Sequence, residues 1–306
     1  MKSMKNLLLP FSILSILCFS CTKVVDADRL LDTEEQFRII GFISPSDTVL
    51  SISVTRALPA IGTELSVEDD EANRQLFLVT DAMVTLSNEN GNNTVLTYNS
   101  ELETYTTPAV NLPIIQGERY FLEVMVDDET FSASCQIPTG TIEITEEISV
   151  NQNSFGERFG TVSFGFQDLI GQRNFYTVGA RVRTIIESTT EEEEPIVDNF
   201  NLFIEDNLLT DNLGDGISLA SSANFFIPED VNLQEATLAL QVANMEEVLF
   251  QSLRASELNT DAIDNPFLEF VIAPNNILEG GAIGVFAGYT LQEKRIFVNQ
   301  ELRPTP

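Results

Sequence analysis

The run Thr48-Val-Leu-Ser-Ile-Ser-Val-Thr55 is the stretch that decides the fold. Every second residue from Leu50 to Val54 is apolar, and the positions between them are mostly small and polar. Successive side chains of an extended chain project from opposite faces, so this period of two predicts a β-strand with one buried face. The turn sequence Pro45–Asp47 precedes the run and separates it from a second strand candidate, Phe37–Ile43.

The same rhythm continues through the first half of the chain, where short alternating runs are separated by turn residues. Two hairpins are predicted, one joining Ala82–Ser87 to Thr94–Tyr98 and one joining Gly117–Val126 to Thr130–Ile137. A polar loop is expected at about residues 59–75. These strands predict a β-sandwich domain over residues 36–139, with an immunoglobulin-like architecture.

The second half is also mostly β and contains one predicted helix. The pattern favours strands at Gly160–Phe166, Asn174–Arg183, Ala236–Val242 and Arg295–Val298. A helix is expected near residues 245–256, with Asn244 as its capping residue and with one buried face formed by Met245, Val248, Leu249 and Leu253. The sequence Pro138-Thr-Gly140 suggests a boundary, so residues 140–306 are predicted to form a second β-sandwich-like domain with this helix inserted.

The extreme N-terminus has the pattern of a bacterial lipoprotein signal. Lys2 and Lys5 precede the apolar run Leu7–Phe19, and the small residue Ser20 stands before Cys21. Residues 1–20 are therefore interpreted as a signal peptide, Cys21 as the acylated first residue of the mature protein, and residues 21–35 as an acidic tether.

Two other interpretations of this N-terminus remain open. Cleavage near the same point without acylation would release a soluble exported protein. An uncleaved membrane span is a third interpretation, although a run of about 13 apolar residues is shorter than the ~20 that a bilayer requires. Compared with most lipoboxes, the chain has Cys18 in place of Leu three residues before the cysteine, and Leu17 lies one residue further out.

Composition restricts the chemistry that this protein can perform. The 306-residue chain contains no histidine, which excludes Ser-His-Asp and Cys-His catalysis and the usual zinc sites. Its net charge of −31 disfavours nucleic acid and anionic headgroups as partners and favours cationic ones. Cys135 has no cysteine left to pair with once Cys18 is removed and Cys21 is acylated, and its alternating surroundings predict a small core residue.

Clustered carboxylates suggest calcium as the one inorganic ligand worth testing, since hard cations prefer oxygen ligands. The best local candidate is formed by Asp211, Asn212 and Asp215. The spacing does not match an EF-hand loop, where Leu213 would have to be an oxygen ligand. The same residues also fit an ordinary Asn/Asp/Gly turn, and this second interpretation is the simpler one. No other cofactor is expected.

Several short motifs, taken together and in order, resemble the domain-of-unknown-function 4249 family of Bacteroidetes surface lipoproteins. The motifs are Asp81-Ala-Met-Val84, Gly117-Glu-Arg-Tyr120, Phe166-Gln-Asp168 with Asn174-Phe-Tyr176, Asp264-Asn-Pro-Phe267, Asn275-Asn-Ile277 and Gly280-Gly-Ala-Ile-Gly284-Val-Phe-Ala-Gly288-Tyr289. The glycine-rich motif is longer here by one residue on each side of Gly280-Gly281. Its glycines suggest bulges or a close approach of two backbones. The resemblance supplies no catalytic residues, and it implies a surface lipoprotein similar in context to components encoded beside TonB-dependent outer-membrane transporters.

These observations lead to an expected function that is not enzymatic. We expect a lipoprotein of the outer membrane, anchored through Cys21 and exposed at the cell surface or on the periplasmic face. It would dock on a TonB-dependent transporter and help to capture or admit a ligand. The alternative is a structural, envelope-assembly or adhesion role without transport. A hydrolase would need two carboxylates converging across a cleft, which adjacent acids on loops do not indicate.

Overall fold

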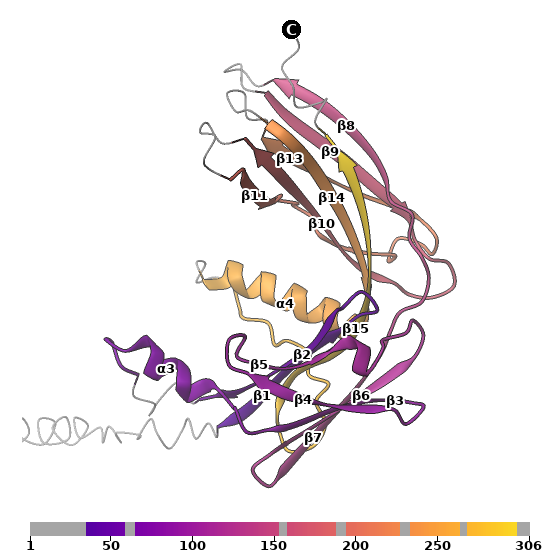
Figure 1. The fold of residues 1–306 in the computed structure, drawn as a ribbon. Helices are drawn as coiled ribbons and strands as arrows, with labels where there is room; N and C mark the ends of the chain where they lie inside the picture. The colour runs from indigo at the N-terminus through magenta and orange to yellow at the C-terminus, as the bar shows by residue number, and fades with distance from the viewer. Residues whose placement is uncertain are drawn as a thin grey trace, which may run out of the picture.

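The structure is a computed structural model that describes residues 35–58, 65–152, 158–187, 194–226, 233–263 and 268–298. The chain forms two β-rich units, one above the other in Figure 1. The prediction of a mainly β, sandwich-like fold is confirmed, and the alternating runs of the sequence form strands. Cys21 and the rest of the predicted signal peptide and tether before Glu35 lie outside the described residues.

The first unit consists of seven strands, a short 3-10 helix and an α-helix that follows the second strand. They are β1 (Gln36–Ile43), β2 (Val49–Ala57), α3 (Asp70–Phe77), β3 (Met83–Asn88), β4 (Asn93–Asn99), β5 (Thr104–Pro108), η1 (Ala109–Asn111), β6 (Arg119–Val126) and β7 (Glu129–Gln136). Both predicted hairpins are present, as β3–β4 and β6–β7.

One sheet curls around the core of the first unit. Its strands follow the order β1-β2-β5-β4-β3-β6-β7, and β4 pairs first with β3 and then with β5, which joins the two halves. The alternation seen in the sequence places Leu50, Ile52 and Val54 inside, each at most 2% exposed. Cys135 on β7 lies in the same core, as predicted.

The second unit is a sandwich of two unequal sheets with one helix. Its elements are β8 (Thr145–Gln152), β9 (Arg158–Gln167), β10 (Phe175–Ile186), β11 (Ile196–Asn201), β12 (Leu208–Thr210), β13 (Ser218–Phe226), β14 (Leu233–Met245), α4 (Glu247–Ile263) and β15 (Ile283–Phe297). A three-stranded sheet, β13-β9-β8, faces the strands β11-β10-β14-β15. A single apolar core contains residues of both sheets, among them Phe164 and Phe225 from one and Val182 and Leu238 from the other.

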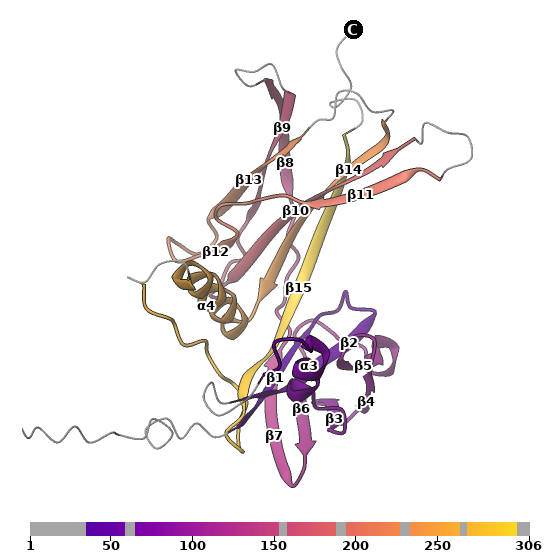
Figure 2. The ribbon, with the colours of Figure 1, turned by 90° about the vertical axis from the view of Figure 1, so that its left-hand side faces the viewer.

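Strand β15 belongs to both units. Its first half pairs with β1 in parallel up to the pair Ile43–Gly288, and its second half pairs with β14 antiparallel from the pair Met245–Tyr289 onward. Figure 2 shows this strand running from the lower unit into the upper one. The sheet is therefore continuous across the molecule, and the change of partner falls between Gly288 and Tyr289.

The C-terminal segment also completes the first core. Ile277, Ala282 and Phe286 pack with the residues of β1–β7, although they come more than 130 positions after the sequence boundary near residue 139. Division of the chain at that boundary assigns all later residues to the second unit, whereas the structure places this short stretch in the first. A backbone pairing between Ser132 and Leu278 adds a further link.

The predicted helix is present as α4, but it begins and ends later than expected. Leu249 is buried in one cluster with Phe175 and Val285, and Val248 and Leu253 pack at its edge, so the predicted apolar face is confirmed for these three helix residues. Met245, the fourth predicted residue, belongs to the same cluster but is the last residue of β14. The predicted cap is wrong. Asn244 is a residue of β14, where it pairs with Tyr176 and Thr290, and the carbonyl of Glu246 accepts the first helical hydrogen bonds instead.

The expected loop over residues 59–75 is only partly correct, because its acidic end starts helix α3. Asp69 accepts a hydrogen bond from the backbone N–H of Ala72 at 2.9 Å and so caps this helix. Asp70 and Glu71 then occupy the first turn, where the helix dipole favours negative charge. The acidic residues Asp69–Glu71 therefore cap and begin a helix, although their sequence predicts a solvated loop.

Candidate functional site

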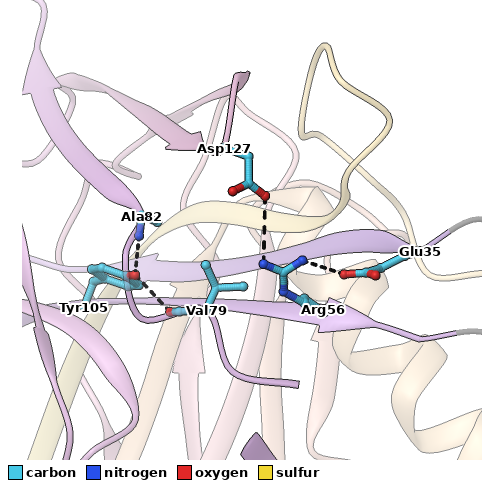
Figure 3. Close-up of polar contacts among 6 residues, drawn as sticks. All are labelled: Glu35, Arg56, Val79, Ala82, Tyr105 and Asp127. Atoms are coloured by element: carbon cyan, nitrogen blue, oxygen red, sulfur yellow. Dashed lines mark hydrogen bonds and ion pairs between the residues drawn. The ribbon is translucent and has the colours of Figure 1, made fainter. Parts of the chain in front are cut away.

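The described chain begins beside an arginine that ties it to the first unit. Figure 3 shows Arg56 of β2 between two acids: its guanidinium donates to Glu35 at 2.6 Å and lies 3.9 Å from Asp127 in the β6–β7 turn. The same guanidinium stacks over the Phe37 ring at 5.2 Å. The hydrogen bond to Glu35 raises the pKa of Arg56. These contacts hold the first described residue, Glu35, beside β2.

The sequence-predicted calcium candidates are brought together only in part. Asp211 and Asp215 converge with a third carboxylate, Asp168, and their oxygen atoms lie within 4.8 Å of one another. We call these three residues the Asp cluster. Asp168 follows β9, more than 40 positions earlier in the sequence, so local spacing could not reveal it. Its only signal was its place in the motif Phe166-Gln-Asp168.

Each member of the Asp cluster accepts a hydrogen bond from nearby protein groups. Asp168 accepts from the Tyr176 hydroxyl at 2.7 Å and from the Gly216 N–H at 2.8 Å. Asp215 accepts from the Gly171 N–H at 3.0 Å, and Asp211 accepts from the Asn174 N–H at 3.1 Å. The carboxylates thereby fasten the loop that follows β9 to the turn that follows β12. Burial, then the neighbouring Asp168, raises the pKa of Tyr176, which keeps this phenol a donor.

Asn212 points to a different partner. Its side-chain oxygen accepts from Arg173 at 3.3 Å, and Arg173 also forms an ion pair with Glu247 at 3.3 Å. The guanidinium lines a shallow depression together with Asp211 and Asp215. Its positive charge would repel a cation bound there. The carboxylate oxygens of the Asp cluster could still bind calcium. Their hydrogen bonds to the protein already account for these residues, because they connect two loops, which agrees with the simpler interpretation as a turn.

The junction between the two units contains a second group of polar contacts, which sequence reasoning missed. The carboxylate of Glu246, at the start of α4, accepts from the Gln136 N–H of β7 at 2.9 Å and from the Gly288 N–H of β15 at 2.8 Å. Burial raises the pKa of this carboxyl. One side chain therefore joins elements that are far apart in the chain, and only the fold brings them to it.

The lone thiol of the described residues is not placed for chemistry. Cys135 is 2% exposed in the first core, and burial raises the pKa of its thiol. The thiolate, which is the reactive form, is correspondingly disfavoured. The predicted structural role of Cys135 is confirmed.

Comparison with known families identifies the chain's relatives. A family model described as a domain of unknown function, DUF4249, matches residues 23–295. The chain belongs to the DUF4249 family. The resemblance of the short motifs is thereby confirmed over nearly all of the chain beyond the predicted signal.

The glycine-rich motif of this DUF4249 protein is the part of β15 that crosses between the units. Gly284 has a φ of +143°, and a Cβ on it would lie 1.8 Å from the Ile39 carbonyl oxygen of β1. A Cβ on Gly288 would lie 2.7 Å from the Gln136 carbonyl oxygen. The close approach of two backbones, expected from these glycines, is confirmed.

Other comparisons are distant. A search of curated proteins finds no match. Among solved structures, the C-terminal globular domain of an oligosaccharyltransferase from Pyrococcus abyssi is 10% identical, with 82% of this chain and 43% of that one covered and a TM-score of 0.16. The B domain of a biofilm-associated protein is 8% identical, with 85% of each chain covered and a TM-score of 0.16. The chain thus spans less than half the length of the first of these.

No helix among the described residues is both long and apolar enough to cross a bilayer. The longest, α4, has charged residues along its length and packs one face on the sheet. The remaining acidic runs of the sequence are exposed surface features where the structure describes them, and Glu71 is paired with Arg74 in α3. Most of the run Glu191–Glu194 lies outside the described residues.

Proposed function

We propose that this DUF4249 protein is a lipid-anchored protein of the outer membrane that assists a TonB-dependent transporter in capturing or admitting a ligand, without catalysis of its own. The observation that carries the proposal is the lipobox-like sequence ending at Cys21. Family membership is consistent with it, because the same family resemblance implied an anchored protein encoded beside such transporters.

The position of Glu35 supports an anchored arrangement. Arg56 pairs with this residue on the first unit, and Figure 1 shows the end of β8 and the start of β9 at the side of the second unit that faces away from the first. The residues between Cys21 and Glu35 span at most about 50 Å when fully extended. With an acyl chain on Cys21, the first unit would stay near the membrane and the second would face outward, where a partner or a ligand can reach it.

The absence of histidine and the buried state of Cys135 support a binding role over a catalytic one. Binding partners are expected to be cationic or neutral, because the net charge of −31 disfavours the approach of anions. A transporter loop rich in lysine and arginine would meet this requirement.

Copurification from outer membranes tests the proposal. The tagged full chain is crosslinked gently in intact cells, extracted in mild detergent and purified, and the expected result is a stoichiometric β-barrel transporter. A matched preparation of Cys21→Ser controls for contacts made after lysis. If no barrel protein is enriched over that control, the transporter partnership is wrong.

A deletion strain separates the proposal from its alternative. Loss of growth on one nutrient, restored by the wild-type chain, supports assistance in uptake. A general sensitivity to detergents and antibiotics without a nutrient defect supports a structural or envelope-assembly role instead.

A further inference from the structure

The sandwich of the second unit is closed along one side and open along the other. On the closed side Lys294 of β15 donates to the Ile144 carbonyl oxygen at 2.9 Å and forms an ion pair with Glu146 of β8. On the other side β10 contacts β13, which is the edge strand of the three-stranded sheet. Strand β11 lies beyond β10, so in the described part of the chain it overhangs the smaller sheet.

The pairing register decides which β11 side chains face the inside. Phe200 pairs with Val182 and Asp198 pairs with Thr184, and directly paired residues project from the same face of a sheet. Val182 and Thr184 are buried in the core, at 4% and 5% exposure. Phe200 and Asp198 therefore face the interior side, yet Phe200 is 55% exposed because the smaller sheet ends before it.

A groove of 410 Å³ fills the space under this overhang. Its apolar lining includes Val182, Phe200, Phe203 and Phe225, which come from β10, β11 with its following loop, and β13. This volume is within the usual range for small-molecule sites, about 300–1,000 Å³, and aromatic side chains are typical of their walls. Phe203 is 83% exposed, so a ligand in the groove would cover two phenyl rings that now contact water.

Among the residues that the structure describes, Asp198 is the one charged residue that lines the groove. It is also the least exposed residue of β11, although it is the only ionisable one in that strand. Among the described residues, no hydrogen bond or ion pair satisfies its carboxylate. Asp198 is partly exposed and faces the groove beside phenyl rings, so its carboxylate is available to a charged ligand there. An organic cation in the groove would give this carboxylate a partner.

We propose that this open groove binds a small organic cation, an amine carried on an apolar ring-containing body. The phenyl rings would cover the apolar body and face the ammonium group, Asp198 would pair with it, and the net charge of −31 would raise the local concentration of cations. The inference goes beyond the proposed function, because binding by the chain alone needs no transporter.

A competing explanation for Asp198 is protection of a sheet edge. Inward-facing charges on edge strands discourage pairing with other molecules, and β11 is an edge strand. That explanation predicts self-association when the charge is removed, and it predicts no ligand. The two explanations therefore give opposite results in one set of measurements.

Three matched compounds test the proposal: naphthylmethylamine, naphthylmethanol and naphthoate. They share one ring system and differ in charge. Binding to the full chain carrying Cys21→Ser is measured by ligand-observed NMR and calorimetry. The amine is expected to bind about tenfold more tightly than the alcohol, and naphthoate is expected to be the weakest. Equal binding of the amine and naphthoate would overturn the proposal, as would the absence of binding by all three.

Variants locate the binding in the groove. Asp198→Asn should weaken the amine about tenfold and leave the alcohol unchanged, whereas Phe200→Ala should weaken both. Phe297→Ala, which removes a 71% exposed ring from β15 outside the groove, is the control and should change neither. An unchanged affinity of Asp198→Asn for the amine contradicts the proposal. If the parent chain binds none of the compounds and Asp198→Asn self-associates, the edge-protection explanation holds instead. Failure to copurify a transporter would leave the result of these titrations intact.

Discussion

The hydroxyl of Tyr289 donates a hydrogen bond to the carboxylate of Asp47 across 3.0 Å, although the residues lie 242 positions apart in the chain. Asp47 lies in the turn between β1 and β2, where it also accepts from the Ser44 N–H at 2.7 Å. Tyr289 is the first residue of β15 to pair with β14. The bond therefore joins a turn of the first unit to the point where the sheet passes into the second.

Tyr289→Phe is expected to loosen this junction. Burial, and then the negative Asp47, raises the pKa of Tyr289 to about 12, so the phenol is a permanent donor at neutral pH. Its loss leaves a half-buried carboxylate with one donor fewer and should cost about 1–2 kcal/mol of unfolding free energy. Denaturant unfolding measures it. Tyr98→Phe is the control, because the Tyr98 hydroxyl has no hydrogen bond to another described residue, and an equal loss in both variants would refute the assignment.

Gly284→Ala is expected to disrupt the contact between β1 and β15. The new methyl group would lie 1.8 Å from the Ile39 carbonyl oxygen, and both atoms belong to paired backbones that cannot move apart without breaking the sheet. We expect a loss of at least about 3 kcal/mol. Gly179→Ala in β10 is the matched control, since its nearest neighbour is the Gln241 side chain at 3.5 Å, and it should melt within a few degrees of wild type. Similar melting temperatures of the two variants would show that the backbones of β1 and β15 do not approach so closely at Gly284.

Glu246 should make stability depend on pH in an unusual direction. Its pKa is raised by burial, so the folded state holds this proton more tightly than the unfolded state does. The contribution of Glu246 is fully present below its unfolded pKa of about 4.3 and is lost as the pH rises through the raised folded pKa.

Glu246→Gln isolates this contribution because glutamine does not titrate. The difference in unfolding free energy, wild type minus variant, should increase as the pH falls from about 7 towards about 4.5. Denaturant titrations at matched ionic strength measure it. A difference that grows towards neutral pH would show that the two backbone donors keep the carboxylate preferentially ionised in the fold, and a flat difference would show that its pKa is the same in the folded and unfolded states. Either result contradicts the prediction.

Asp168→Asn should weaken the loop fastening formed by the Asp cluster. An amide can accept from either Tyr176 or Gly216, but its NH2 group then faces the other donor, so we expect a loss of about 1–3 kcal/mol. Thermal melting of chelator-treated protein measures this loss.

The same melting experiment decides the calcium question. We expect the melting temperature of the wild type to be unchanged by millimolar calcium, because backbone and phenol donors already engage the cluster. A rise that disappears in Asp215→Asn would establish a metal site instead, since a ligand that binds only the folded state stabilises it by mass action.

Cys21→Ser should release an intact fold from the membrane. Every described contact involves residues from Glu35 onward, so melting behaviour should match that of the wild type. Labelled palmitate should be incorporated into the wild type and not into the variant, and the variant should move to the soluble fraction. Retention of the variant in washed membranes would mean that acylation is not what holds the protein there.

The strands and the main helix could be predicted because their signal is local. Leu50, Ile52 and Val54 alternate, and Leu249 and Leu253 recur at helical spacing, and both patterns follow from the repeat of a single element. Strand β13 was missed because its run of Ser and Ala residues has little alternation. Asn244 was taken as a helix cap because its chemistry suits one, but pairing on both sides keeps it in β14.

The candidate sites were less predictable than the elements. Asp211 and Asp215 were found from their spacing, whereas Asp168 and Glu246 act through partners that are distant in the chain. The overhang of β11 depends on the number of strands in the opposite sheet, which no local pattern encodes. Nothing in the sequence therefore distinguishes Asp198 from the other acidic residues.

The sequence by itself determined the period of strands such as β2 and of helix α4, the burial of Cys135 and the need for glycine where two backbones meet, because these depend on the stereochemistry of neighbouring residues. Only the tertiary structure decided that β15 leaves β1 for β14 at Gly288, and that Tyr289 thereby reaches Asp47. The choice of partner depends on how distant strands pack and on the chain entropy lost in bringing them together, and neither is written in any one stretch of sequence.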